Sequence, residues 1–283
     1  MKTHRERLED CISNNKSDRP PVALWRHFPM DDQDPYSLAK ATLTFQQTFD
    51  FDFVKVTPSS SFCLKDWGAE DEWRGASEGT RDYTHTVIQR PEDREKLPVL
   101  NPNAGHLAEE LECLRILVAE LGSDTPVIQT IFNPLSQAKN LVGDVKLLVH
   151  ARRYPDALLA GLKIITESTV RFIEAALKTG IAGIFFAVQH AQFGLMSEAE
   201  YLQFGKPFDL QTLEPARSMW LRMLHLHGKN VMFNLVKEYP ANIINWHDRE
   251  THPSLSKGLV DFPGAVCGGV SRTTLVYANS SEV

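Results

Sequence analysis

The chain is poor in the features that indicate a disulfide-stabilised, secreted or membrane-spanning protein. Its 283 residues include only four cysteines, and no Cys-x-x-Cys pair occurs. Widely spaced cysteines of this kind are typical of reduced thiols in the cytoplasm. No apolar stretch reaches the roughly 18 residues that a membrane span requires, and the N-terminus lacks the apolar core of a secretory leader. We therefore expect a cytoplasmic protein that does not enter a membrane.

Positive charge is also scarce. The chain has 30 Lys and Arg against 36 Asp and Glu, which gives a formal net charge of −6. Nucleic-acid-binding proteins usually carry a basic excess, so we expect no nucleic-acid partner. The hydrophobic fraction of 42% is ordinary for a globular protein and allows a large core. The length fits one large α/β barrel or two smaller domains.

Several common catalytic and nucleotide-binding motifs are missing. The sequence has no Gly-x-Ser-x-Gly elbow, no His-Glu-x-x-His, no EF-hand loop and no Gly-rich phosphate loop. Gly268-Gly269 is the nearest approach to a phosphate loop, and it is a weak one. These absences argue against an α/β-hydrolase, a zinc protease of that type, a calcium sensor and a dinucleotide-binding fold.

What the chain does contain is a regular alternation of apolar runs and helical segments. We predict strands at 21–28, 52–57, 126–132, 183–189, 222–227, 242–247 and 264–270. Helices are predicted at 3–15, 36–49, 104–121, 135–150, 154–179, from Ser197 onward, at 231–239 and at 252–259. Residues 62–97 have no clear period, and we expect a long excursion with a short helix or hairpin. Such alternation predicts a parallel sheet with right-handed crossovers.

Polar side chains gather at the C-terminal ends of the predicted strands. Histidine stands at four of these seven ends, although the whole chain has only 10 histidines. In a closed barrel these ends meet in one bowl, where barrel enzymes carry their active sites. The candidate residues are Arg26, His27, Ser59, Asn133, Gln189, His190, His225, His227, Trp246, His247 and Asp248.

His225 and His227 are the strongest candidates for a metal site. On a strand, side chains at i and i+2 leave the same face, so both imidazoles point the same way. Such a pair is half of a metal site or the floor of a polar pocket, and the alternative is a hydrated strand face. A further ligand could come from His247 or His190.

The other candidates have a structural alternative beside each functional role. Arg26 could clamp a carboxylate or phosphate, or it could pair with Asp31 or Asp32. His27 and His190 could contact substrate or be hydrogen-bonded wall residues. Asp248 can orient His247 only if the strand ends before them. We expect catalytic roles for Arg26, His247 and Asp248, and we expect Arg26, His27, Ser59, Asn133, Gln189, His190 and Trp246 to bind substrate.

Five motifs together resemble the uroporphyrinogen decarboxylase superfamily over nearly the whole chain. They are Arg19-Pro20-Pro21-Val22 leading to Arg26, Phe51–Val56 closing on Trp67-Gly68, Phe193–Ser197, the His-x-His-Gly stretch, and Val266–Arg272. The resemblance implies an α/β fold, a (β/α)8 TIM barrel forming a single domain over residues 1–283 with its site in the bowl. Because the chain stops soon after the seventh predicted strand, we expect the last strand and helix to be missing.

The decarboxylase branch of this superfamily works without a cofactor and uses two arginines, an aspartate and a tyrosine. The resemblance places Arg26 on the first arginine. It places Met30 near the second arginine, Ser59 on the aspartate and Asn140 on the tyrosine. Three of the four functional groups of that branch therefore have no counterpart at the expected positions.

The methyltransferase branch binds zinc through His-x-Cys and a later cysteine, and it activates a thiol. The resemblance places His225 on the first ligand and His227 on the position of the thiolate. It therefore favours zinc-dependent methyl transfer involving a thiol or a corrinoid carried by a partner protein. The alternatives are decarboxylation of a tetrapyrrole side chain and a non-catalytic ligand-binding barrel or fragment. A small-molecule substrate is expected, and a homodimer is compatible with this fold.

Overall fold

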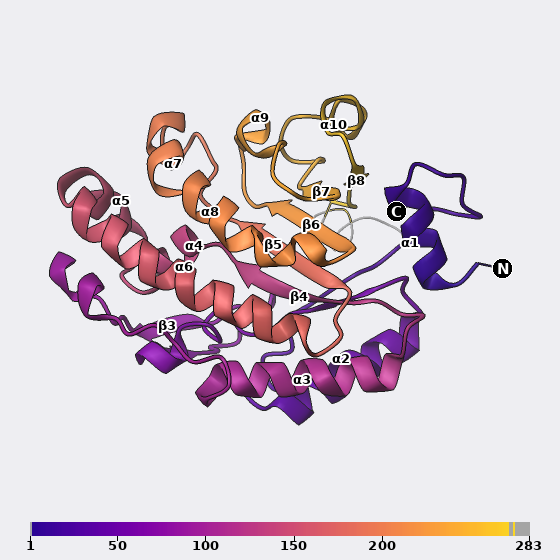
Figure 1. The fold of residues 1–283 in the computed structure, drawn as a ribbon, viewed down its shortest axis with the longest axis horizontal. Coiled ribbons are helices and arrows are strands. Elements are labelled where there is room, and N and C mark those ends of the chain that lie inside the picture. Colours follow the sequence, from indigo (N-terminus) through magenta and orange to yellow (C-terminus); the bar gives the residue numbers. More distant parts are fainter. Residues whose placement is uncertain (1, 272–273, 275–283) are drawn as a thin grey trace.

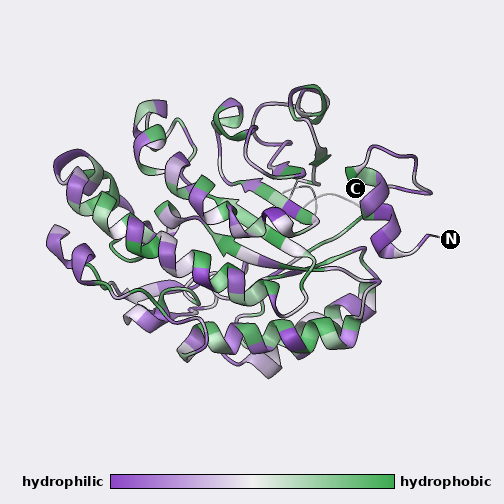
Figure 2. Ribbon diagram, viewed as in Figure 1, coloured by the Kyte–Doolittle hydropathy of each residue, from purple (hydrophilic) through white to green (hydrophobic). Residues whose placement is uncertain are grey.

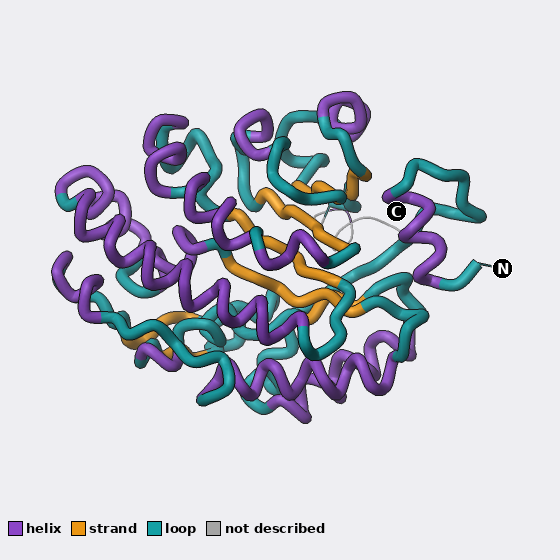
Figure 3. The backbone as a smooth tube through the Cα atoms, in the orientation of Figure 1, coloured by secondary structure: helices purple, strands orange, loops and turns teal. Residues whose placement is uncertain are grey.

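A parallel sheet forms the centre of the protein. The computed structural model describes residues 2–271 and 274, and its main sheet has six strands. They are β1 (Val54–Val56), β4 (Val127–Phe132), β5 (Gly183–Val188), β6 (Leu221–Leu226), β7 (Ile243–Trp246) and β8 (Ala265–Cys267). Neighbouring strands follow chain order and all pair in parallel. Figures 1 and 3 show them side by side with helices outside. The predicted α/β class is confirmed.

Helices connect these strands and cover the outside of the sheet (Figure 1). They are α1 (His4–Ile12), α2 (Pro35–Phe49), α3 (Gly105–Leu121), α4 (Pro134–Asn140), α5 (Asp144–Arg153), α6 (Pro155–Leu177), α7 (Glu198–Phe204), α8 (Lys206–Leu213), α9 (Phe233–Val236) and α10 (Leu255–Asp261). Short 3₁₀ turns occur at Lys65–Trp67, Pro91–Lys96 and Pro215–Ser218. Within the described residues, none of the helices is both long enough and apolar enough to cross a membrane.

The core lies between the sheet and the helices. Every residue of β4 and β5 is buried, as expected for parallel strands that are covered on both faces. Figure 2 shows the same pattern in colour, with hydrophobic strands at the centre and mixed hydropathy on the surrounding helices. Long apolar runs without polar alternation in the sequence are thus explained by burial on two sides.

The predicted strand at 21–28 is wrong. These residues run without a strand ladder. Pro21 has no N–H to donate, and the N–H of Val22 is taken by the side chain of Asp52, with 2.6 Å between N and Oδ2. The Asp52 N–H in turn donates to the Val22 carbonyl at 2.8 Å. An apolar run of strand length therefore lies beside β1 without joining the sheet.

Two predicted helices are each broken into a pair. The segment 135–150 splits into α4 and α5 around Gly143, which has a φ of +96°. The helix starting after Ser197 has the predicted reciprocal cap between Ser197 and Glu200. It is interrupted at Gly205, where a Cβ would lie 2.4 Å from the Tyr201 ring.

The expected excursion between 62 and 97 is present and contains a hairpin. Its strands, β2 (Glu70–Glu72) and β3 (Asp82–His85), pair antiparallel. Arg81 anchors the hairpin, because its guanidinium donates to Asp71 at 3.0 Å and to Asp32 at 3.1 Å. The hairpin is thereby fixed against the segment that precedes α2.

Candidate metal centre and cavity

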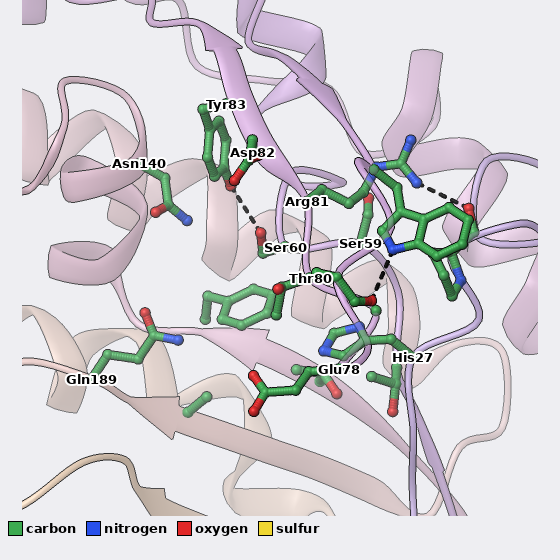
Figure 4. A pocket seen from close by; sticks show the side chains of 18 of the residues that line it. His27, Ser59, Ser60, Glu78, Thr80, Arg81, Asp82, Tyr83, Asn140 and Gln189 are labelled. Carbon is green, nitrogen blue, oxygen red and sulfur yellow. Dashed lines mark hydrogen bonds between the residues drawn. The ribbon is translucent and has the colours of Figure 1, made fainter.

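A cavity of about 1620 Å³ lies at the C-terminal ends of β1, β4, β5 and β6. Residues 75–83 of the hairpin form one of its walls. In Figure 4, Asn140 and Gln189 face the open space from one side, and His27 and Glu78 lie across from them. The lining includes six of the residues predicted from sequence, namely Arg26, His27, Ser59, Gln189, His225 and His227.

Three histidines converge at one edge of this cavity. The possible ligand atoms of His225, His227 and His247 all lie within 4.8 Å of one another. Their ring centroids are 5.4 to 5.9 Å apart. Strand register explains the meeting: Leu226 of β6 pairs with Trp246 of β7, so the residues that follow them are neighbours. In the described part of the chain, these three histidines are the one set of at least three His, Cys, Asp or Glu side chains that lie close enough together to hold a metal ion.

A hydrogen bond fixes how His225 can act. Its Nδ1 lies 2.6 Å from Oδ1 of Asn245, while Nδ2 of Asn245 donates to the Cys267 carbonyl at 2.8 Å. Since the amide nitrogen is committed to that carbonyl, Oδ1 must accept, and Nδ1 of His225 carries the proton. Burial, followed by the neighbouring His227, lowers the pKa of His225 to about 3. The ring is therefore neutral at pH 7, and its Nε2 carries a free lone pair.

The donor set of the three histidines fits a zinc ion. Zinc is commonly held by three protein ligands with Zn–N distances of roughly 2.0–2.1 Å, and a fourth position stays open for substrate. Donor atoms already within 4.8 Å of one another need only small side-chain rotations to converge. The bond from His225 to Asn245 is also the kind of outer contact that orients metal-binding imidazoles.

Two other residues near this edge do not belong to the three-histidine group. His190 is buried, its Nδ1 has no hydrogen-bond partner among the described residues, and burial lowers its pKa to about 4. Cys267 ends β8, and burial raises the pKa of its thiol to about 11. That thiol stays protonated, so it is unlike an activated cysteine.

The structure does not bring Asn133, Trp246 or Asp248 to the cavity lining. Asn133 caps α4 and donates to the Asp209 carboxylate at 2.9 Å. Trp246 is 2% exposed and its indole N–H donates to a backbone carbonyl in the following loop. β7 ends at Trp246, before His247, but the Asp248 carboxylate accepts from the N–H of Gly269 at 2.9 Å. Asn133 therefore caps a helix, Trp246 packs in the core, and Asp248 holds the segment after β8.

Arg26 and His27 lie at the rim of the cavity. Arg26 is exposed, and its side chain donates to the His27 carbonyl and lies over the Phe28 ring at 5.4 Å. The carboxylate of Asp32, considered above as its partner, accepts from Arg81 instead. His27 Nδ1 is buried without a hydrogen-bond partner among the described residues. Burial, followed by the charge of Lys55, lowers the pKa of His27 to about 4.

Lys55 is a residue that sequence reasoning missed. It lines the cavity although it is only 8% exposed. Its Nζ donates to Thr57 Oγ1 at 3.2 Å and lies 4.6 Å from the centroid of Phe185 and 5.5 Å from that of Trp25. Burial lowers its pKa to about 7. A lysine between two valines near the middle of a predicted strand was the signal that could have revealed it.

Comparison with known families decides the assignment of the fold. The family model described as "Uroporphyrinogen decarboxylase (URO-D)" matches residues 3–283. The chain belongs to the uroporphyrinogen decarboxylase family. The superfamily resemblance drawn from strand-end motifs is thus confirmed, although Arg272, which closes the last of those motifs, lies outside the described residues.

Two proteins that are similar to this chain are methyltransferases by name. A solved methyltransferase from Methanosarcina mazei superimposes with a TM-score of 0.80 at 20% identity, covering 95% of this chain and 82% of that one. The methylcobamide:CoM methyltransferase MtbA of Methanosarcina acetivorans is 24% identical over 145 residues. That alignment covers 50% of this chain and 42% of the relative. The first likeness establishes the family's barrel-type fold for this chain.

Proposed function

We propose that the protein is a zinc-dependent methyltransferase that transfers a methyl group to or from a thiol, with a corrinoid carried by a partner protein. The observation that carries this proposal is the convergence of His225, His227 and His247 within 4.8 Å at the edge of a large cavity. The name of the similar protein from Methanosarcina acetivorans supports methyl transfer with a cobamide.

The residues of the chain divide the work of such a site. His225, His227 and His247 would hold the metal, and Asn245 keeps His225 in the tautomer that leaves Nε2 free. When bound, zinc would lower the pKa of a thiol and so supply a more nucleophilic sulfur. His227 is exposed and borders both the large cavity and a smaller one of about 280 Å³. A substrate and a partner's cofactor can therefore approach the cluster from solvent.

Family membership by itself does not choose between methyl transfer and tetrapyrrole decarboxylation. The residues in the cavity favour methyl transfer. Ser59, where the resemblance expects a catalytic aspartate, is buried and shares a hydrogen bond of 3.0 Å with Ser61. Arg26 is the one residue of this chain that matches a functional group of the decarboxylase branch, and it lies exposed at the rim of the cavity. A hydroxyl cannot supply the charge of a carboxylate there, so decarboxylation lacks its central group.

Metal content is the direct test. Protein purified without chelators is expected to contain close to one zinc per chain by elemental analysis, and His225→Ala combined with His227→Ala should abolish it. His106→Ala is a matched control, because His106 is a partly exposed histidine on α3 that contacts Glu109. Metal-free wild-type protein would overturn the proposal. Formation of coproporphyrinogen from uroporphyrinogen would instead establish the decarboxylase alternative.

A further inference from the structure

We propose that Lys55 forms an anion subsite on the wall of the large cavity and that it binds a carboxylate or sulfonate group of the substrate. The proposal rests on the proposed function only for the choice of this cavity as the substrate site. The three-histidine cluster could bind a metal whether or not Lys55 binds an anion. The metal site and the anion subsite can therefore be tested separately.

The first argument is that Lys55 is buried without a compensating negative charge. Its residue exposure is 8%, and among residues 2–271 and 274 no carboxylate oxygen lies within 4.0 Å of its ammonium group. Two other cations that line the cavity have such partners: Lys139 pairs with Asp144 at 3.3 Å, and Arg81 pairs with Asp32 at 3.1 Å. Arg26 and Lys146 also line the cavity, but both are exposed, so that water solvates their charges. A buried, uncompensated charge is costly, and an anionic ligand removes that cost.

The second argument is the hydrogen-bonding capacity that remains on Lys55. An ammonium group has three N–H donors, and the described contact uses one of them, to Thr57 Oγ1 at 3.2 Å. The rings of Trp25 and Phe185 attract the positive charge at 5.5 and 4.6 Å, but a ring face is a poor substitute for an oxygen acceptor. The aromatic walls thus hold the ammonium in place and leave donors for a ligand oxygen.

The third argument concerns the charge of the ligand. Lys55 is accompanied in this part of the cavity by His27, whose low pKa keeps it neutral at pH 7, and by Glu78, whose negative charge acts on His27. The buried Nδ1 of His27, which has no partner among the described residues, can share a proton with a ligand atom but adds no positive charge. With a pKa of about 7, Lys55 is about half protonated at pH 7 when the cavity is empty, and a bound anion favours its protonated form, which balances one negative charge. The site therefore suits a monoanion, such as a carboxylate or sulfonate, better than a phosphate dianion.

The position of Lys55 also fits a small substrate that reaches the histidines. Phe185 separates the two sites: its centroid is 4.6 Å from the Lys55 ammonium and 5.0 Å from the centroid of His225, on which it stacks. These two distances place the ammonium within about 10 Å of the His225 ring. A molecule of a few bonds can therefore hold its anion at Lys55 while its reactive end faces the three-histidine cluster.

Binding of simple monoanions tests the subsite without any thiol or methyl donor. Butyrate and its neutral amide, butyramide, are titrated into the full-length protein by calorimetry, with propanesulfonate and inorganic phosphate in parallel. Wild-type protein should bind butyrate or propanesulfonate roughly 10–100-fold more tightly than butyramide, the factor expected for a hydrogen bond to a charged group. The tighter of the two monoanions identifies the group that the site takes.

Variants then assign the preference to Lys55. Lys55→Met has a similar volume without charge and should erase the preference, whereas Lys139→Met, which removes an ion-paired lysine of the same cavity, should keep it. Thr57→Val leaves the lysine but removes the hydroxyl that positions it, and should reduce the preference for the anion several-fold. This variant keeps the proposal testable if Lys55→Met does not fold.

Three outcomes would each overturn the proposal: equal binding of butyrate and butyramide, a preference for the anion that survives Lys55→Met, or tighter binding of phosphate. Zinc content unchanged in Lys55→Met would show that the metal site is independent of this outcome.

Discussion

At the scale of single residues, the tautomer of His225 depends on one neighbour. Asn245 lies opposite His225 in the register of β6 and β7, and its oxygen accepts the Nδ1 proton at 2.6 Å. Without that acceptor, the imidazole could rotate or carry its proton on Nε2, the nitrogen whose lone pair is otherwise free to bind a metal. Outer contacts of this kind typically change metal affinity by about 10- to 100-fold.

Asn245→Ala should therefore weaken zinc binding by roughly 10- to 100-fold while leaving His225, His227 and His247 in the chain. Competition against a chromogenic chelator measures the dissociation constant. Asn245→Asp is the informative companion, because it keeps an oxygen that can accept from His225 and should retain most of the affinity. If Asn245→Ala binds zinc as tightly as the wild type, the hydrogen bond does not orient the ligand.

The sequence pointed to the three histidines that the structure brings together in the candidate site, but not to Asn245 or Lys55. His225 and His227 were identifiable because a strand period of two places them on one face, and His247 because it follows a predicted strand end. Asn245 supports His225 only through a register that joins residues 20 positions apart. Lys55 could be identified only by knowing which side of β1 faces the cavity. Because every residue of β1 is buried, the strand has no alternation of polar and apolar residues that would indicate that side.

At the scale of secondary structure, the junction between α7 and α8 depends on the absence of a side chain. A Cβ on Gly205 would lie 2.4 Å from the fully buried ring of Tyr201. Periodicity alone predicts one continuous helix from Ser197, because it does not include this steric contact. Similarly, 21–28 has the composition of a strand, but Pro21 and the carboxylate of Asp52 occupy the positions that ladder hydrogen bonds would need.

Gly205→Ala should destabilise the protein by about 1–3 kcal/mol, the usual cost of forcing extra volume into a packed site. Urea unfolding measures it as a lower midpoint at an unchanged slope. Gly194→Ala is the matched control, because a Cβ there would have no atom within 4 Å and should change the stability little. An equal effect of the two substitutions would contradict the steric explanation.

At the scale of the whole molecule, a buried polar network joins segments that are distant in sequence. The carboxylate of Asp209 in α8 accepts from Asn133 at the start of α4 and from the hydroxyls of Tyr201 in α7 and Tyr239 after α9. Parallel order and family could be predicted from strand and helix alternation and from the strand-end motifs. This network could not, because one of its hydrogen bonds joins residues 76 positions apart and its members carry no local pattern.

The network makes the stability of the fold depend on pH in a direction that can be worked out. Burial raises the pKa of Asp209 to about 7, whereas an aspartate in the unfolded chain has a pKa of about 4. Between these values the folded protein holds a proton that the unfolded chain has lost. Asp209 therefore stabilises the fold most below about pH 4, and this contribution is lost as the pH rises through about 7. Its size is at most about 4 kcal/mol.

Asp209→Asn isolates this contribution, because the amide keeps the shape of the side chain but does not titrate, and the tyrosine hydroxyls can rotate to accept from it. His27 and His190 have lowered pKa values and favour the fold as pH rises, and the raised pKa of Glu110 acts in the same sense as Asp209. Since these groups are common to both proteins, they cancel in the difference. We subtract the free energy of unfolding of Asp209→Asn from that of the wild type, both measured by urea titration. We expect this difference to fall steadily between about pH 4 and pH 8. The exposed carboxylate of Asp82 provides the control Asp82→Asn. A flat difference for Asp209→Asn would mean that the carboxyl is already ionised in the folded protein throughout this range.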